Sequence, residues 1–272
     1  MLGRLLRSLV GPSAPALRLC PVCRSTPRRF SPIHPSFREQ SIRYGFPYFD
    51  DAETLNQEEY ICADCGAFDR VRLYVLYLDE ALAEVPADQP VRLLHVAPEI
   101  GFEHWLARYP NVRRTTLNVT PGAAQIHADI CAMPEIASES FDVLICSHVL
   151  EHVADDHAAM TELARVLVPG GWGIIMVPLY PERVLATDED PVEPSAQERV
   201  RRFGQKNHVR LYAKRDFLMR LASAGFRVEC LGREYFGADV LTHCGIGPGS
   251  VLYVVRKPGL DPAPGAQSGR ST

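Results

Sequence analysis

From Val91 onward, short apolar runs alternate with amphipathic stretches, and this alternation predicts a parallel β-sheet with helices on both faces. The runs that predict strands are "VRLLHVA", "RRTTLNV", "AQIHADI", "FDVLICS", "WGIIMVP", "FRVECL" and "SVLYVVRK". Helical segments stand between them, for example "GFEHWLARY" and "AKRDFLMRLASAG". The pattern therefore predicts an α/β fold, a doubly wound, seven-stranded, mostly parallel, Rossmann-like sheet.

Helical spacing also appears in residues 155–168, where Ala159, Leu163, Val166 and Leu167 fall on one face. The "PGG" that follows is expected to end this helix before the fifth strand. Sheets of this kind bind ligands outside the carboxyl ends of their strands, near the point where the strand order reverses. We therefore expect the functional site beside the first strand.

The segment before this sheet has a different composition, with much proline and aromatic residue and two C-x-x-C pairs. Cys20 pairs by spacing with Cys23, and Cys62 with Cys65, which predicts a structural zinc ion held by four thiolates. With all four positions taken by thiolates, such a site has no open position for catalysis. The expected parts are a basic leader (1–18), a zinc-ribbon-like module with a connecting helix (19–80), the sheet domain (88–258) and a disordered tail (259–272).

Composition restricts the function classes. Among 272 residues, 29 are basic and 33 acidic, so the net charge of -4 argues against a duplex-DNA binder. Four of the eight cysteines are solitary by spacing, which favours a reducing, cytoplasmic compartment over a disulfide framework. No run predicts a transmembrane segment, and the basic opening "MLGRLLRSLV" is expected to be a solvated leader, with a transit peptide or a membrane-surface helix as the alternative.

The motif "HVLEH", from His148 to His152, has two interpretations. As H-x-x-E-H it is the metal-binding pattern of inverted zinc peptidases, in which it lies within a long helix. Here it directly follows a buried strand and ends in "VADD", which is typical of the cap of the next helix. We therefore expect a turn in which Glu151 and His152 brace the backbone, His152 as a packing histidine.

In its neighbourhood, "FDVLICSHVLEHVADD" followed by "ELARVLVPGG", the motif resembles the class I S-adenosylmethionine-dependent methyltransferases, in particular the methyltransferase-11-like group. More narrowly, the chain resembles bacterial methyltransferases with an N-terminal four-cysteine module, a "HVAPE" first motif and an "FGQ..HVR.Y" segment. The resemblance implies S-adenosylmethionine as cofactor and transfer of its methyl group.

The resemblance also assigns the cofactor site. After the first strand the family has an acid and a glycine-rich turn, and "HVAPEIG" departs from this pattern by having His95, Ala97 and Glu99 where an acid and two glycines are usual. Glu99 is expected to supply the carboxylate for the cofactor's ammonium, with an ordinary surface glutamate as the alternative. Asn118 stands where an acid usually holds the ribose. The residues assigned to the cofactor are Ala97, Pro98, Glu99, Gly101, Asn118, Asp129, Ile130, Ser147 and His148.

Methyl transfer requires an aligned acceptor and a group that takes its proton. His148 is one candidate base, and "HVRLY" supplies His208, Arg210 and Tyr212 after an insertion expected to cover the site. Arg210 is expected to pair with an anionic group of the acceptor. The alternative is that these residues fasten the lid, with Arg210 paired to an internal acid such as Glu151.

The same insertion carries a run of basic residues, and a run that lines the mouth of the site would favour an anionic acceptor, whereas a solvated face would not. Its members are Arg199, Arg201, Arg202, Lys206, Arg210, Lys214, Arg215 and Arg220. The expected function is thus methyl transfer to a small-molecule acceptor. The alternatives are an RNA methyltransferase with a zinc module, which the acidic overall charge disfavours, and a binding protein with weakened catalysis, which "HVAPEIG" and Asn118 motivate.

Overall fold

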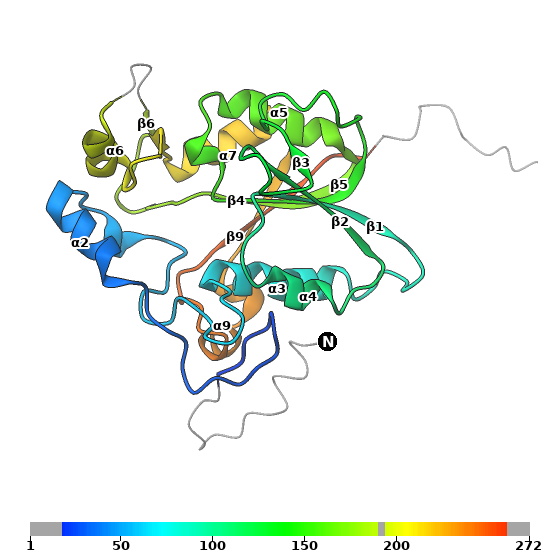
Figure 1. Ribbon diagram of the computed structural model, residues 1–272, viewed down its shortest axis with the longest axis horizontal. Coiled ribbons are helices and arrows are strands. Elements are labelled where there is room, and N and C mark those ends of the chain that lie inside the picture. Colours follow the sequence, from blue (N-terminus) through cyan, green and yellow to red (C-terminus); the bar gives the residue numbers. More distant parts are fainter. Residues whose placement is uncertain (1–17, 190–193, 260–272) are drawn as a thin grey trace, which may run out of the picture.

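The computed structural model describes residues 18–189 and 194–259 (Figure 1). Apart from Arg18 and Gly259, the expected basic leader and the expected tail lie outside the described residues. In the part of the chain that is described, no helix is both long and apolar enough to cross a membrane.

A seven-stranded sheet forms the centre of the molecule, in the order β3-β2-β1-β4-β5-β9-β8. Neighbouring strands are parallel except at β9, which runs antiparallel to both β5 and β8. The strands are β1 (Val91–Val96), β2 (Val112–Asn118), β3 (Ile126–His127), β4 (Phe141–Ser147), β5 (Leu167–Met176), β8 (Arg227–Leu231) and β9 (Leu252–Arg256). The predicted doubly wound, mostly parallel sheet is confirmed.

Helices cover both faces of this sheet (Figure 1). One face carries α3 (Asp69–Ala81), α4 (Phe102–Leu106) and α9 (Ala238–His243), and the other carries α5 (Asp156–Val166) and α7 (Lys214–Ser223). The alternation of side chains along a strand explains this division, because Leu93 of β1 lies in the hydrophobic cluster of the first face and its neighbour Leu94 in that of the second. Two further helices of this domain are short: α8 (Arg233–Phe236) and the 3-10 helix η2 (Leu150–His152).

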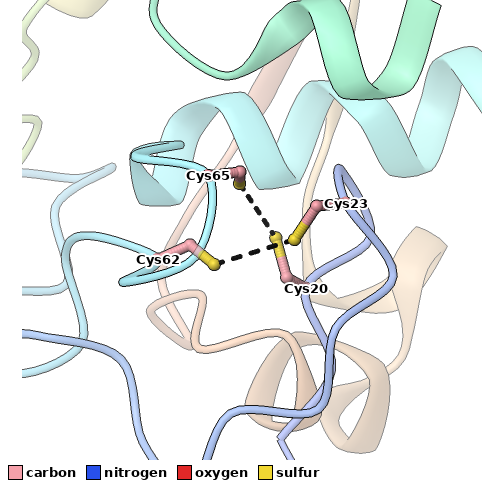
Figure 2. Close-up of side chains that lie close together, drawn as sticks. All are labelled: Cys20, Cys23, Cys62 and Cys65. Atoms are coloured by element: carbon pink, nitrogen blue, oxygen red, sulfur yellow. Dashed lines mark hydrogen bonds between the residues drawn. The ribbon is translucent and has the colours of Figure 1, made fainter. Parts of the chain in front are cut away.

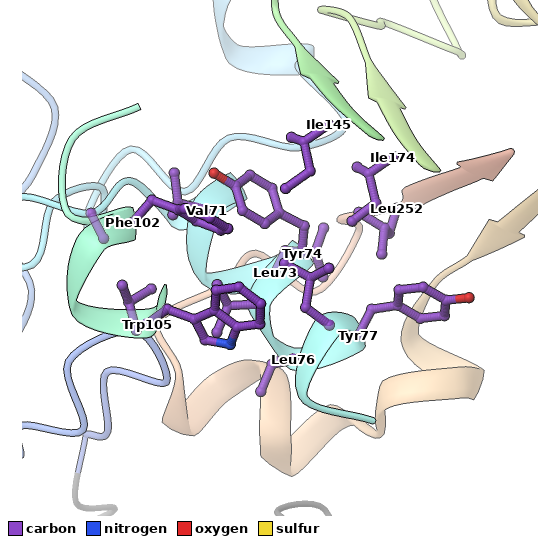
Figure 3. Close-up of a cluster of buried hydrophobic side chains, with 14 of the residues drawn as sticks. Val71, Leu73, Tyr74, Leu76, Tyr77, Phe102, Trp105, Ile145, Ile174 and Leu252 are labelled. Carbon is purple, nitrogen blue, oxygen red and sulfur yellow. The ribbon is translucent and has the colours of Figure 1, made fainter. Parts of the chain in front are cut away.

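Helix α3 joins the cysteine-bearing front segment to the sheet. It begins four residues after Cys65, and its residues 71–78 are all buried. Figure 3 shows Leu73 and Tyr74 from this helix beside Ile145, Ile174 and Leu252 from three strands. The front segment and the sheet therefore share one continuous hydrophobic cluster, which also contains Cys20 and Cys62.

An insertion after β5 lies beside the front segment, at the left of Figure 1. It consists of β6 (Asp188–Glu189), α6 (Ala196–Phe203) and β7 (Arg210–Leu211), and β6 pairs antiparallel with β7. Helix α2 (Pro35–Tyr44) and the 3-10 helix η1 (Phe49–Asp51) belong to the front segment. A small cluster containing Phe46, Tyr180 and Phe203 joins the two parts. We call the insertion, residues 180–212, the lid.

One local expectation is wrong. The helix before the fifth strand ends at Val166 rather than at "PGG", because β5 already begins at Leu167 and passes through these residues. The pairing with β4 is irregular there: Leu167 faces Phe141, whereas Trp172 faces Val143. Gly170 has a left-handed backbone (φ 79°), so the glycines allow a bulge in the strand instead of ending the helix.

Candidate functional site

The four cysteines of the front segment come together. Figure 2 shows the two close sulfur pairs: Cys20 Sγ lies 3.8 Å from Cys65 Sγ, and Cys23 Sγ lies 3.9 Å from Cys62 Sγ. All four sulfur atoms lie within 4.8 Å of one another. Zinc–sulfur bonds of about 2.3 Å in a tetrahedron place the sulfur atoms roughly 3.8 Å apart, so the cluster fits one tetrathiolate ion.

This cluster rests on the turn after β1. A Cβ atom at Gly101, whose φ is 87°, would lie 2.6 Å from the carbonyl oxygen of Cys65 and 3.1 Å from the amide nitrogen of Ala67. On the other side of the contact, a Cβ at Gly66 would lie 2.9 Å from Ile100 Cγ2. Glycine at 101 thus makes room for the second cysteine pair, which differs from the expected role of admitting the cofactor.

Glu99 lies in a buried polar cluster of its own. One of its oxygens, Oε2, accepts a hydrogen bond from Tyr74 Oη at 3.0 Å and lies 2.9 Å from His95 Nε2. Arg70 Nε is 3.5 Å from the other oxygen. Burial alone would raise the pKa of Glu99, but the hydrogen bond and charge of His95 and the charge of Arg70 outweigh burial and lower it. The carboxylate expected to hold the cofactor's ammonium is therefore already engaged with these three side chains.

Two non-glycine residues have left-handed backbone conformations, one at the carboxyl end of β1 and one at that of β4. Ala97 has a φ of 46° and His148 a φ of 55°. These strands are neighbours, and the strand order reverses between them, so both residues lie at the switch point of the sheet. Left-handed non-glycine residues cost energy and collect at functional sites. The structure thus indicates a ligand site at the edge where the sequence predicts it.

The other residues assigned to the cofactor lie along the same edge. Asn118 Oδ1 accepts a hydrogen bond from the amide of Thr120 at 2.9 Å, and Asp129 Oδ1 accepts one from the amide of Cys131 at 2.9 Å. Asp129 is exposed and Ile130 buried, whereas Pro98 is half-buried in the turn after β1. The hydroxyl of Ser147, at the end of β4, is buried and has no hydrogen-bond partner among the described residues.

A cavity of about 340 Å³ opens next to this edge, beyond the ends of β4 and β5. Most of its wall is apolar and aromatic, and it is formed by three parts of the chain that are distant in sequence: the front segment, the strand ends and the lid. Its polar side chains include Arg70, His148, Glu151, His152 and His208. Such a mixture, apolar walls with a few convergent polar groups, is typical of a small-molecule site.

Burial shifts the acid–base behaviour of the groups in this cavity. It lowers the pKa of His148 well below the usual value, with the charge of Arg70 as the next cause, and it lowers the pKa of His208 to about 3. The same burial raises the pKa of Glu151 to about 8. His148 Nδ1 lies 3.5 Å from Glu151 Oε1. At neutral pH both histidines are therefore uncharged.

The three lid residues proposed for catalysis have different surroundings. His208 lines the cavity, whereas Tyr212 is buried and donates a hydrogen bond to Asp156 Oδ2 at 2.5 Å. Arg210 is also buried: its guanidinium donates to the carbonyl oxygens of residues 150, 153 and 154 and to Glu189 Oε2. These contacts favour the fastening role for Arg210 and Tyr212 over contact with an acceptor, although the acids that pair with Arg210 are Glu189 and Asp156 rather than Glu151.

Replacing Arg210 by methionine should therefore lower stability by about 2 to 3 kcal/mol, because three backbone carbonyls and Glu189 lose their donor. Thermal unfolding measures this loss. Arg201→Met is the matched control, since Arg201 lies in the same insertion with a side chain that is 57% exposed and pairs with Glu198 on the surface. Equal melting temperatures for the two variants would contradict the fastening role.

Much of the basic run, which continues past the lid onto α7, is paired with acids. Arg201 pairs with Glu198, Lys214 with Glu53, and Arg220 with Asp156, Asp216 and Glu189. Arg202 pairs with Asp188. Because these charges are already paired, the basic run gives little reason to expect an anionic acceptor.

Sequence reasoning missed the contribution of the front segment to the cavity. Arg70 lies between Glu99 and Tyr60, and its Nη1 donates to Tyr60 Oη at 3.2 Å. Its guanidinium stacks on the ring of Phe68, 4.8 Å from the ring centre. Phe37 and Phe49 belong to the same wall. The aromatic content of the front segment was the available signal, because a metal-stapled module by itself has little need for so many rings.

Comparison with known proteins adds one decisive match. A family model described as "Methyltransferase domain" matches residues 106–175, the part of the chain from α4 to β5. This segment is similar to a methyltransferase domain. The resemblance to the class I methyltransferases is thereby confirmed, and the matched segment includes Asn118, Asp129 and the "HVLEH" turn.

Solved structures of similar shape include the [4+2]-cyclase SpnF, which is 16% identical, with a TM-score of 0.47 over 85% of this chain and 99% of that one. The YcgJ protein from Bacillus subtilis is 15% identical, with a TM-score of 0.43 over 67% of this chain and 97% of that one. No curated protein matches the chain in sequence. Similarities of this size carry no information about the reaction or the acceptor.

Proposed function

We propose that the chain transfers a methyl group from S-adenosylmethionine to a small-molecule acceptor held in the cavity beside His148. The observation that carries this proposal is the switch point between β1 and β4, where Ala97 and His148 have left-handed backbones and His148 lines the cavity. Doubly wound sheets bind their ligands at this place. The match of residues 106–175 to a methyltransferase domain supports methyl transfer as the chemistry.

Several groups at the strand ends fit the cofactor. Ser147 has a buried hydroxyl without a partner, which a ligand atom would satisfy. Asp129 is exposed and uses one carboxylate oxygen for the amide of Cys131, and Asn118 still has its amide N–H groups to donate. Ile130 would supply an apolar wall for the adenine. We therefore retain the assigned set with two changes: Glu99 supports the turn through His95 and Tyr74, and Gly101 makes room for Cys65.

The cofactor supplies a methyl group on a positively charged sulfur. During transfer the nucleophilic atom of the acceptor forms a bond to the methyl carbon, the carbon–sulfur bond breaks, and its electron pair stays on sulfur. His148 lies between the strand edge and the cavity, so it is the side chain that takes the proton released by the acceptor. The cavity walls exclude water and orient the acceptor for in-line displacement.

The acceptor should have an apolar body, because apolar side chains, many of them aromatic rings from the front segment and the lid, form most of the wall. Arg70 is the only lysine or arginine among the residues that line the cavity. An anionic group of the acceptor would be placed next to it, in competition with Glu99. The paired charges of the lid add no support for an RNA acceptor.

A second candidate function, ligand binding without catalysis, is favoured by one observation. Glu99 is engaged in a buried cluster and Asn118 uses its oxygen for Thr120, so the cofactor would gain fewer charged contacts than the family usually provides. Direct measurement of cofactor binding separates the two candidates.

Calorimetric titration with S-adenosylmethionine should show saturable binding to the purified chain, and Asp129→Ala should weaken it by about 1 to 3 kcal/mol through the loss of a charge-assisted hydrogen bond. Glu135→Ala, which removes an exposed carboxylate a few residues away, is the control. Normal affinity in Asp129→Ala would remove Asp129 from the site. Absence of binding in the unaltered chain would overturn the methyltransferase proposal in favour of the second candidate.

A cytoplasmic location is part of the same proposal. None of the eight cysteines, all within the described residues, forms a disulfide. Free thiols together with a tetrathiolate cluster are typical of a reducing compartment.

A further inference from the structure

A second cluster of metal-binding side chains lies in the cavity. Glu151 and His152 come from η2, and His208 comes from the lid, yet one ligand atom from each lies within 4.8 Å of the others. His152 Nε2 is 3.9 Å from Glu151 Oε1, and the His152 and His208 rings are 4.7 Å apart, edge to face. The "HVLEH" motif thus gathers its glutamate and second histidine with a histidine distant in sequence.

Both histidines are oriented by the protein backbone. Nδ1 of His152 lies 3.1 Å from the carbonyl oxygen of Asn207, and Nδ1 of His208 lies 2.8 Å from that of Phe203. Because a carbonyl oxygen only accepts, each Nδ1 must carry the proton, which leaves Nε2 with a free lone pair. A backbone carbonyl that fixes the ring through the other nitrogen is the usual support of a metal-binding histidine.

Glu151 has no partner that would explain its burial. Its side chain is 2% exposed, and neither carboxylate oxygen has a hydrogen bond within the described residues. The nearby Arg210 is taken up by backbone carbonyls and Glu189. A buried carboxyl group without a partner is costly, and it lines the cavity together with the two histidines. A cation among these three groups would remove this cost.

We propose that Glu151, His152 and His208 bind one divalent transition-metal ion, distinct from the ion of the four cysteines. Two imidazole nitrogens and one carboxylate oxygen form a donor set that suits zinc, iron(II), cobalt(II) or manganese(II). Metal–ligand bonds of about 2.0 to 2.2 Å bring neighbouring ligand atoms to roughly 3 to 3.5 Å, so small side-chain rotations close the present spacing.

The ion would have a function in the reaction, and this step rests on the proposed function. A site with three protein ligands would leave a coordination position open, as in catalytic metal sites, and all three ligands line the cavity. An acceptor with an oxygen donor, such as a hydroxyl or carboxylate, would complete the coordination. In that arrangement the pKa of the bound hydroxyl would be lowered, which would make it a better nucleophile for the methyl group.

The test is a calorimetric titration of Co²⁺ into the tag-free chain after its four-cysteine site has been saturated with zinc, without cofactor or acceptor. The unaltered chain should bind one equivalent. Glu151→Gln and His208→Ala should each weaken the binding at least about tenfold, because each removes a ligand. His157→Ala, which removes an exposed histidine from the neighbouring helix α5, should bind like the unaltered chain.

Three results would overturn the metal site. They are no binding of Co²⁺ to the unaltered chain, an affinity in Glu151→Gln and His208→Ala equal to that of the unaltered chain, or a loss of affinity in His157→Ala as large as in those two variants. Glu151→Gln keeps the size of the side chain, so it remains informative if His208→Ala does not fold. Titration of S-adenosylmethionine into the same preparations reports on the proposed function separately. A chain that binds the cofactor but not Co²⁺ contradicts the metal site and leaves methyl transfer standing.

Discussion

Replacing Cys62 by serine should lower the melting temperature of the whole protein by more than about 10 °C, as expected for a loss of at least 4 kcal/mol in a domain of this size. The four sulfur atoms hold two segments that have little regular structure of their own, and the energy of metal binding is folding energy for such segments. The loss should not stay local, because Cys62 and Cys20 lie in the same hydrophobic cluster as the sheet-facing side of α3. A single unfolding transition at a lower temperature is therefore expected.

Cys230→Ser is the matched control, since Cys230 is exposed and lies on β8, outside the cluster. Elemental analysis should find one less zinc per chain in Cys62→Ser and an unchanged amount in Cys230→Ser. A strong chelator should bring the unaltered chain down to the melting temperature of Cys62→Ser. Unchanged zinc content and stability in Cys62→Ser would rule out the tetrathiolate site.

Arg72→Met should lower the free energy of unfolding by about 3 to 5 kcal/mol, because it removes the central polar connection between the front segment and the residues after α9. The fully buried guanidinium donates to five backbone carbonyls, those of residues 59, 60, 67, 244 and 245. It also stacks on Phe30, 3.9 Å from the ring centre. Each carbonyl left without a donor in the interior adds to the cost.

Chemical denaturation of three variants separates the causes of this loss. Arg113→Met changes an exposed arginine on β2 and should leave stability almost unaltered. Arg72→Lys keeps the positive charge but lacks the planar fork, so it should be nearly as unstable as Arg72→Met. Full stability in Arg72→Lys would show that charge, and not the pattern of hydrogen bonds, is what the site requires.

The sequence was sufficient for the sheet because its central strands β1, β4, β5 and β9 are largely buried and stand out as apolar runs. It was less informative wherever a short element depends on distant partners. The pair β6 and β7 contains two residues in each strand, and α2, α6, α8 and α9 lack a long apolar repeat, so their formation depends on packing against segments far away in the chain.

The candidate site shows the same division. The place of the site followed from the order of strands, and His148 and His208 do line the cavity. The roles expected for Gly101 and Glu99 differ from their surroundings in the structure. Their partners, the carbonyl oxygen of Cys65 and the side chain of Tyr74, belong to the front segment, whose position against the sheet cannot be read from the sequence pattern. Arg70 escaped notice for the same reason.

The bonds from Arg72 also bear on how the protein matures during synthesis. Two of the carbonyls that accept from Arg72 belong to Cys244 and Gly245, and the amide of Leu19 donates to His243. These partners leave the ribosome some 170 residues after Arg72 itself. A nascent chain can bring its four thiolates together early. The front segment, however, lacks these partners until α9 has emerged, so for most of translation its buried face is open to chaperones.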